Sequence, residues 1–330
     1  MARMRIGFIG AGGIARRHMA NLQGFDDVAI AAVADPVPER AAEAAARTGA
    51  RPYADHRAML EAEQIDACYV CLPPFAHGAP ERDLVERGVP FFVEKPLAAA
   101  EEQAEAIGAL VARSGLVTAV GYHWRYLDTT EEAMELLARK PARLVTGYWL
   151  DSTPPPAWWS RQDQSGGQMV EQTTHIFDLA RLLVGPVDEV AAMAGRTGRD
   201  AYPDCDVDEA STAALRFASG AVGSISSTCL LGWPHRIGLN LFCDGMAIEL
   251  TEFDLMVDVG AGRPVRSAQG DPFVREDRDF VDAVAGRANR IRAPYLDALE
   301  THRLAIAAAR SARDRRPIQP RRGPPVDGAR

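Results

Sequence analysis

Residues 4–15 read Met-Arg-Ile-Gly-Phe-Ile-Gly-Ala-Gly-Gly-Ile-Ala, a short apolar run followed by a glycine turn and a helix-like stretch. This order is typical of the dinucleotide-binding fingerprint of an α/β fold. Gly10 permits the tight turn, and Gly12 lets the backbone approach a pyrophosphate without a Cβ in the way. The helix start at Gly13 and Ile14 is expected to offer free N–H groups to the phosphates. The stretch predicts a nucleotide site; the alternative is a glycine-rich turn that binds nothing.

A second apolar run, residues 28–34, ends at Asp35, where a carboxylate would accept hydrogen bonds from the adenosine ribose. A carboxylate at this position repels a 2′-phosphate, and residues 36–38 (Pro-Val-Pro) add no basic group to receive one. Arg40 and Arg51 could compensate from elsewhere in the chain. The sequence therefore predicts NAD as the cofactor in preference to NADP.

Length and composition describe an ordinary globular protein. A chain of 330 residues is long enough for two domains, each with its own core. The net charge of −8 argues against nucleic acid as a partner, and no apolar run approaches a membrane span. The five scattered cysteines favour a reducing cytoplasm. Cys68 and Cys71 imitate a metal or redox pair, but within a strand they would lie on opposite faces, so no metal is expected.

The chain has two regions with different sequence patterns. The first ~120 residues alternate short apolar runs with helix-like stretches, which indicates a parallel sheet with helices on both faces. From about residue 142, alternating Ser/Thr-rich strands joined by hairpin turns indicate an open, mostly antiparallel sheet with helices on one face. We therefore expect an α/β protein with a Rossmann dinucleotide-binding domain (1–122). An α/β domain for substrate binding and oligomerisation (123–330) follows, and its C-terminal helix could pack back on the first domain. The expected strands cover 4–9, 28–34, 65–71, 89–93, 116–120, 144–150, 211–217, 221–230, 237–243 and 246–250, and closing helices cover about 273–286 and 295–312.

Lysine is nearly absent from this chain. Of the 37 lysines and arginines, only Lys95 and Lys140 are lysines. A partly buried lysine can lose its proton, which an arginine cannot, and its compact charge can depress a neighbour's pKa. Lys95 lies in Glu94-Lys95-Pro96, directly after a strand, at the sheet edge where ligands of such folds bind. Lys95 and Glu94 are therefore candidate cofactor-binding residues, with a surface loop lysine as the alternative for Lys95. Lys140 is expected at the surface.

A second loop, Leu72-Pro73-Pro74-Phe75-Ala76-His77, follows the strand that ends at residue 71. Proline fixes a backbone beside which a flat ligand can lie. His77 stands where a helix begins, and it either contacts the cofactor or orders the loop. Leu72, Pro73 and His77 are therefore candidate cofactor residues.

A third constellation follows the glycine break at residues 166–167. Glu171 and His175 are four residues apart, which places them on one face of a helix, with Asp178 a further turn on. A histidine with a carboxylate one turn away suits proton transfer near neutral pH, although most such pairs are structural. In the second domain of a nucleotide-binding protein, the pattern favours a catalytic role for His175 and Glu171.

Taken together, these motifs resemble the glucose–fructose oxidoreductase / inositol dehydrogenase / rhizopine-catabolism (Gfo/Idh/MocA) family. The matching features are the fingerprint, the Pro-Pro-x-x-His loop, Glu94-Lys95-Pro96, the segment 121–126 (Gly-Tyr-His-Trp-Arg-Tyr) and the Gly-Gly…His…Asp stretch, in the family's order over residues 5–185. The resemblance implies hydride transfer between a nicotinamide and a hydroxyl carbon of a sugar, polyol or related ring. It also implies an open sheet that packs against other subunits, hence a homodimer or homotetramer.

The resemblance further implies roles for single residues. Lys95 would be the catalytic lysine, with a cis bond to Pro96, and His175 the general acid/base that Glu171 orients. His123, Trp124 and Arg125 would join Lys95, Glu171 and His175 around the substrate. Two positions depart from the family: Glu171 stands where many polyol dehydrogenases carry Asp, and Trp124 where many relatives carry Arg. Trp124, with Trp158, Trp159 and Trp233, favours stacking on a substrate ring, with a core or interface position as the alternative.

Two other functions fit the same motifs. One is a glycoside hydrolase of this fold that holds NAD tightly and oxidises its substrate transiently. The other is a non-enzymatic, cofactor-binding regulator, against which the joint presence of Lys95 and His175 argues.

Overall fold

The computed structural model of the chain describes residues 3–321 and 323, so residues 324–330 of the predicted second domain lie outside it. The chain divides into two compact units. Unit 1 contains the chain up to Ala98, Glu102–His123 and Asp271–Ala298; unit 2 contains Ala99–Glu101, Trp124–Gly270 and the chain from Leu299. The segment Asp271–Ala298 therefore belongs with the first unit, whereas the sequence analysis assigned it to the second domain.

Unit 1 is built on a six-stranded parallel sheet with the strand order β3-β2-β1-β4-β5-β6. This is the doubly wound order of dinucleotide-binding folds. Successive strands are added on one side of β1 up to β3 and then on its other side from β4 onward. The predicted Rossmann domain is confirmed. Sequence analysis missed β3, because its three residues include a proline and carry no apolar run. The strands are β1 (Met4–Ile9), β2 (Val28–Ala34), β3 (Arg51–Tyr53), β4 (Ala67–Val70), β5 (Phe91–Val93) and β6 (Thr118–Val120).

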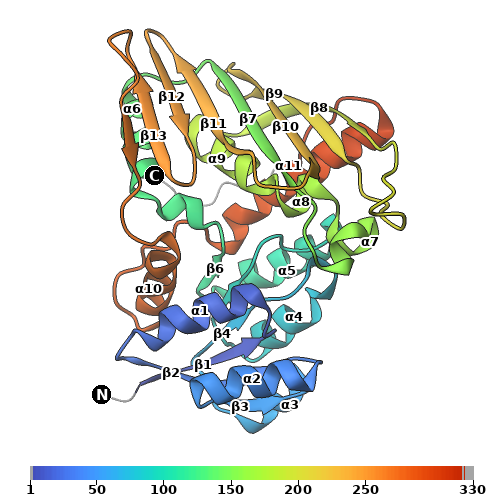
Figure 1. Ribbon diagram of the computed structural model, residues 1–330. Helices are drawn as coiled ribbons and strands as arrows, with labels where there is room; N and C mark the ends of the chain where they lie inside the picture. The colour runs from blue at the N-terminus through green and yellow to red at the C-terminus, as the bar shows by residue number, and fades with distance from the viewer. Residues whose placement is uncertain (1–2, 322, 324–330) are drawn as a thin grey trace. The chain divides into compact units, whose positions relative to one another are not determined.

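The helices of unit 1 pack on this sheet, and α2 does so through a face of small residues. In α2 the buried positions are Ala41, Ala44 and Ala45, the spacing of one helix face, and Gly49 ends the helix in the left-handed conformation. Helix α10 lies beside α1 in Figure 1, and Phe280 of α10 joins the buried core of the sheet. The helices are α1 (Gly13–Gln23), α2 (Pro38–Thr48), α3 (His56–Ala62), α4 (Ala79–Glu86), most of α5 (Glu101–Ser114) and α10 (Pro272–Val284), with the 3₁₀ turn η1 (Pro74–Ala76).

Unit 2 is built on an eight-stranded sheet with the order β14-β13-β12-β11-β7-β10-β9-β8. The central pair β7–β10 is parallel and the other pairs are antiparallel, which confirms the predicted open, mostly antiparallel sheet. The strands are β7 (Leu144–Ser152), β8 (Val187–Gly195), β9 (Ala210–Phe217), β10 (Val222–Leu231), β11 (Arg236–Cys243), β12 (Met246–Leu250), β13 (Asp254–Asp258) and β14 (Val265–Ser267).

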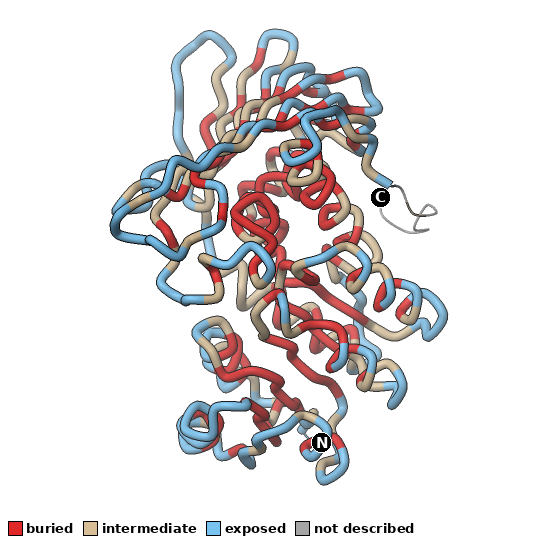
Figure 2. The backbone as a smooth tube through the Cα atoms, turned by 90° about the vertical axis from the view of Figure 1, so that its right-hand side faces the viewer, coloured by how far each residue is buried: buried red, intermediate tan, exposed pale blue. Residues whose placement is uncertain are grey.

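One face of this second sheet packs on helices. Side chains of alternate strand positions, such as Val145, Ile225 and Leu241, join residues of α6, α9 and α11 in one buried core. Figure 2 shows the same alternation, with buried segments along strands and helices and exposed loops at their ends. The helices are α6 (Asp128–Arg139), α7 (Gln162–Ser165), α8 (Gln168–Glu171), α9 (Thr174–Val184) and most of α11 (Tyr295–Asp314), with most of the 3₁₀ turn η2 (His123–Tyr126) and the 3₁₀ turn η3 (Ala157–Ser160). Among the helices that the structure describes, none has the length and apolar character required to span a bilayer.

Candidate functional site

The glycine loop after β1 has the geometry of a phosphate cradle. Gly10 has φ +94°, and a Cβ there would collide with the carbonyl oxygen of Cys71 at the end of β4. Ideal Cβ positions on Gly12 and Gly13 meet no atom within 4 Å, so the space before α1 is open. No side chain caps the start of α1, and its first turn carries no acidic residue. The N–H groups at this helix start, which includes Ile14, therefore fit an anionic pyrophosphate.

Asp35 lies at the end of β2 and is buried. Its Oδ2 accepts the Ala11 N–H at 2.9 Å, and its Oδ1 accepts the Val37 N–H at 2.8 Å. Each carboxylate oxygen has a further lone pair, so the group can also accept a ribose hydroxyl. Asp35 thus orders the glycine loop as well as marking the ribose position, a structural role that sequence analysis missed.

The loop after β4 is held by His77. The buried imidazole makes two hydrogen bonds, from Nδ1 to Glu81 Oε1 at 2.5 Å and from Nε2 to the Leu72 carbonyl oxygen at 3.1 Å. The Gln103 amide donates to the His77 carbonyl. Of the two interpretations of His77, these bonds support the ordering of the loop. Contact of Leu72, Pro73 or His77 with a cofactor stays a prediction.

Lys95 follows β5 at the same sheet edge, because β1, β4 and β5 are neighbouring parallel strands. The Lys95–Pro96 peptide bond is cis, as the family resemblance implied. Glu94 is buried, and its Oε2 accepts the Lys95 N–H at 3.1 Å. A Cβ on Gly121 would collide with the Glu94 carboxylate, so a glycine is required there. The backbone of Lys95 is therefore anchored by its own neighbour.

A histidine that sequence analysis missed lies beneath Glu94. His18 of α1 is fully buried, with Nε2 3.0 Å from Glu94 Oε1 and Nδ1 2.7 Å from Asp277 Oδ1. Burial alone would lower the pKa of His18, but Asp277 and Glu94 together raise it well above its ordinary value. Sequence analysis could not identify this cluster, because the partners lie 76 and 259 positions away.

In unit 2, the expected single helix across Glu171 and His175 is wrong. Helix α8 ends at Glu171 and α9 begins at Thr174. The His175 N–H donates to the Gln172 carbonyl, three positions back, at 3.3 Å. Two consecutive β-branched residues, Thr173 and Thr174, disfavour helix continuation at this point. The four-residue spacing therefore does not by itself place Glu171 and His175 on one helix face.

Two tryptophans hold these two groups. The Trp149 ring of β7 stacks on the His175 ring, with centroids 5.6 Å apart and an interplanar angle of 16°. The Trp159 Nε1 donates to Glu171 Oε2 at 2.7 Å. Trp159 is fully buried, which confirms the core alternative for this residue. Sequence analysis passed over Trp149, although its strand pattern placed it on a predicted strand.

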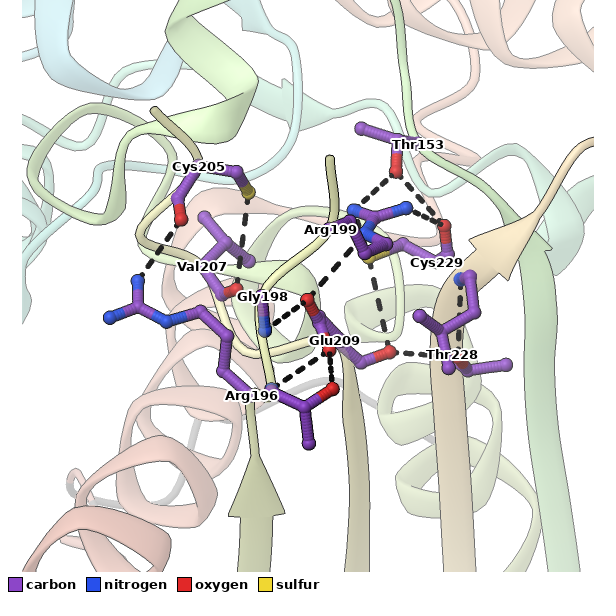
Figure 3. A network of polar contacts seen from close by, with 11 residues as sticks. Thr153, Arg196, Gly198, Arg199, Cys205, Val207, Glu209, Thr228 and Cys229 are labelled. Atoms are coloured by element: carbon purple, nitrogen blue, oxygen red, sulfur yellow. Dashed lines mark hydrogen bonds and ion pairs between the residues drawn. The ribbon is translucent and has the colours of Figure 1, made fainter. Parts of the chain in front are cut away.

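A polar network supports the cluster of Trp159, Val207 and Cys229 (Figure 3). Glu209 accepts the Thr197 N–H at 3.0 Å and the Gly198 N–H at 3.1 Å. The Thr197 N–H bond and the nearby Arg199 lower the pKa of the Glu209 carboxyl. Arg199 in turn donates to Thr153 Oγ1 at 2.9 Å and to the Cys229 carbonyl at 3.2 Å. The network thus fixes the loop between β8 and β9 against the ends of β7 and β10.

Three side chains of the segment 121–126 have contacts within the protein. Trp124 is buried in the core of unit 2, which argues against its stacking on a substrate. Arg125 makes two bonds to Asp178, from Nε at 2.7 Å and from Nη2 at 2.6 Å, in a buried ion pair. His123 belongs to unit 1 and stacks on Phe273, with centroids 4.1 Å apart. Arg125 is used structurally, so a substrate contact by Arg125 or His123 stays a prediction.

Known proteins share both the sequence pattern and the fold. The family described as "Oxidoreductase family, NAD-binding Rossmann fold" matches residues 4–122, and its C-terminal domain matches residues 142–249. The chain is 29% identical to the inositol 2-dehydrogenase of Rhizobium meliloti, over 96% of this chain and 98% of that protein.

Further relatives agree. The scyllo-inositol 2-dehydrogenase (NAD(+)) of Bacillus subtilis is 28% identical over 71% of this chain and 70% of its own length. A levoglucosan dehydrogenase structure in complex with NADH superposes with a TM-score of 0.85 at 22% identity, covering 97% of this chain and 99% of that one. With the cradle of Gly10, Gly12 and Gly13 and the carboxylate of Asp35, these matches identify unit 1 as an NAD-binding domain. The chain belongs to the Gfo/Idh/MocA oxidoreductase family.

Proposed function

We propose that this oxidoreductase transfers a hydride between NAD and a hydroxyl carbon of a sugar, polyol or related cyclic compound. The observation that carries the proposal is the position of Lys95, anchored by Glu94 at the sheet edge that also bears the nucleotide cradle. Ligands of doubly wound folds bind at this edge. The names of the relatives, which include inositol and levoglucosan dehydrogenases, support the substrate class.

Each proposed group has a distinct task. The Lys95 ammonium donates a hydrogen bond to the reacting oxygen and stabilises negative charge on it. The His175 imidazole takes the hydroxyl proton during oxidation and returns it during reduction. Glu171, held by Trp159, has the task of orienting the imidazole. When bound, the nicotinamide supplies the hydride acceptor or donor.

The test is absorbance in the reduced-nicotinamide band while the protein meets NAD or NADP and a panel of sugars, inositols and sugar acids. We expect NADH with one substrate group, and kcat reduced at least ~100-fold by Lys95→Met and by His175→Ala. Lys140→Met is the matched control, because Lys140 is the other lysine of the chain, and it should retain activity. Full activity of Lys95→Met, or NAD binding without turnover across the panel, would contradict the proposal.

We also propose that the free face of the second sheet packs against another copy, giving a homodimer or homotetramer. Leu144, Val222 and Phe242 are paired across β7, β10 and β11 and are 43%, 47% and 40% exposed. Around them the face carries small polar side chains, with Thr212 bonded to Ser226 at 3.0 Å. A sheet face with an apolar group suits contact between sheets.

The five free cysteines support a proposal of a reducing compartment, the cytoplasm.

A further inference from the structure

We propose that His18 is a positioning residue, which holds the catalytic lysine in place through Glu94. The proposal rests on the function proposed above for Lys95. It follows from a continuous chain of hydrogen bonds inside unit 1. This chain runs from Asp277 of α10, through the His18 ring of α1 and the Glu94 carboxylate, to the Lys95 N–H.

A doubly protonated His18 ring satisfies both of its contacts. Both ring nitrogens face carboxylate oxygens, at 2.7 Å for Asp277 and 3.0 Å for Glu94. A neutral imidazole carries one N–H and would leave a lone pair facing the other carboxylate, whereas an imidazolium donates to both. The charge is tolerated in a buried site because two carboxylates pair with it. His18 therefore fixes the direction of the Glu94 carboxylate.

Glu94 has little freedom to move once it is held in this way. Its Oε1 faces His18 and its Oε2 accepts the Lys95 N–H, so both carboxylate oxygens are engaged. Gly121 packs so closely on the carboxylate that a Cβ there would collide with it. Phe92 and Tyr69 pack on the His18 ring, with centroids 4.9 and 5.3 Å away. Any displacement of His18 is therefore expected to move the backbone of Lys95.

The chain of bonds also links the nucleotide cradle to Lys95. His18 lies on α1, the helix whose start forms the nucleotide cradle. Asn21, one turn further on the same helix, donates to Asp277 Oδ2 at 2.8 Å and holds the second anchor. One helix thus carries the phosphate-binding N–H groups and the group that places Lys95. Positioning within about 1 Å can change a rate about 100-fold, so this link has a catalytic consequence.

Glu276 is the third carboxyl near His18, and it raises the alternative of a metal site. Its carboxylate is fully buried, and neither oxygen has a hydrogen-bond partner among the described residues. Burial raises its pKa well above the ordinary value, which favours a neutral carboxyl that adds no third negative charge. Ligand atoms of His18, Glu94 and Glu276 lie within 4.8 Å of one another, so a cation is the competing explanation.

The experiment measures kcat, the Kd for NADH and the melting temperature of His18→Phe and Glu94→Gln. Each variant is made in the wild-type and the Lys95→Met backgrounds. Phenylalanine keeps the ring packing but removes both donors, and glutamine keeps the shape but removes the charge. We expect kcat to fall about 10- to 100-fold in the wild type. The Kd for NADH should change less than about threefold, and in Lys95→Met the further loss should be less than about threefold.

Two matched controls define the background. His56→Phe removes another histidine–carboxylate bond of unit 1, to Asp83 at 2.9 Å, and Glu276→Gln changes a buried carboxyl of the same cluster. Both should retain kcat. Equal losses of kcat in the two backgrounds would overturn the positioning role. It would also be overturned if the loss of kcat came with a matching rise in the Kd for NADH or with a fall in the melting temperature. A stoichiometric cation, bound by the wild type and lost in Glu276→Gln, would also overturn it. Full activity of Lys95→Met alone would refute the proposed function, and with it this inference.

Discussion

At the scale of single residues, three buried polar or charged groups that the motifs selected bind the protein's own chain. Asp35 accepts two backbone N–H groups, His77 bonds to Glu81 and Leu72, and Arg125 pairs with Asp178. A buried charge without partners is costly, so these internal bonds are expected wherever such a group has no ligand beside it. Sequence motifs selected these residues as candidates, but motifs do not distinguish a group that touches a ligand from one that builds the loop around it.

Asp35→Asn separates these two roles. The loss of charge removes the repulsion of a 2′-phosphate, so the ratio of kcat/KM for NAD to that for NADP should fall about tenfold. The amide NH₂ would face one of the two N–H donors, so the free energy of unfolding should also fall by about 1–2 kcal/mol.

Asp55→Ala is the control for this prediction, because Asp55 caps α3 by accepting the Arg57 and Ala58 N–H groups and alanine removes both bonds. It should destabilise the protein without changing the cofactor ratio. An unchanged ratio in Asp35→Asn would remove Asp35 from cofactor selection.

At the scale of elements, apolar periodicity predicted most strands that the structure describes and missed β3, β8, β13 and β14. Strand β3 has three residues and is mostly exposed, and β14 is equally short. The break between α8 and α9 was missed because helical spacing of Glu171 and His175 does not register a local change in backbone hydrogen bonding. Helix α10 was predicted as a helix, but its place in unit 1 depends on contacts distant in sequence.

An ion-pair cluster fastens the α10 segment to the sheet of unit 1. Arg278 bonds to Asp27 at 2.9 and 3.1 Å, and Arg287 bonds to the same carboxylate at 2.7 Å. Arg278 first, and Arg287 with it, lower the pKa of Asp27 from 3.8 to about 2. Because the folded pKa lies below the unfolded value, the carboxylate stabilises the fold above pH 3.8, and this contribution is lost as the pH falls through about 2.

Asp27→Asn should therefore lower the free energy of unfolding at pH 7 by about 0.5–1 kcal/mol, a modest figure because Asp27 is partly exposed. The difference between wild type and variant should shrink as the pH falls from 3.8 to about 2. Denaturant unfolding across this range measures it, with the exposed neighbour Asp26→Asn as control. A difference that is constant with pH would show that the ion pairs do not account for the effect.

At the scale of the whole molecule, each unit has its own core, and the chain returns to unit 1 for residues Asp271–Ala298 before it ends in unit 2. One face of the second sheet is buried against helices in the core of unit 2. Its other face carries the exposed group of Leu144, Val222 and Phe242, which a second copy would cover.

Leu144→Glu places a charge at the centre of that group. Burial of an unpaired carboxylate is costly, so light scattering should show a shift toward a smaller species, with NADH binding retained. Phe253→Glu is the control, because Phe253 is 71% exposed and lies in the turn between β12 and β13. It should leave the size unchanged. An identical mass for wild type and Leu144→Glu would contradict assembly through this face.

The sequence by itself determined the fold class, the nucleotide cradle and the identity of Lys95, Glu171 and His175 as candidates. These features depend on short-range patterns: glycines that need open space or positive φ, a strand end followed by a charged residue, and the alternation of buried positions. Such patterns can be recognised in the sequence because each is formed by residues close together in the chain.

Only the tertiary structure decided which residues support these candidates. His18 meets Glu94 and Asp277 across 76 and 259 positions, Trp159 bonds to Glu171 across a loop, and β7 lies parallel to β10. Trp124 packs in the core of unit 2 and Arg125 pairs with Asp178, two contacts that the sequence motif did not predict. The physical reason is that burial and ion pairing depend on the whole packed unit, where partners come from segments that no local pattern connects.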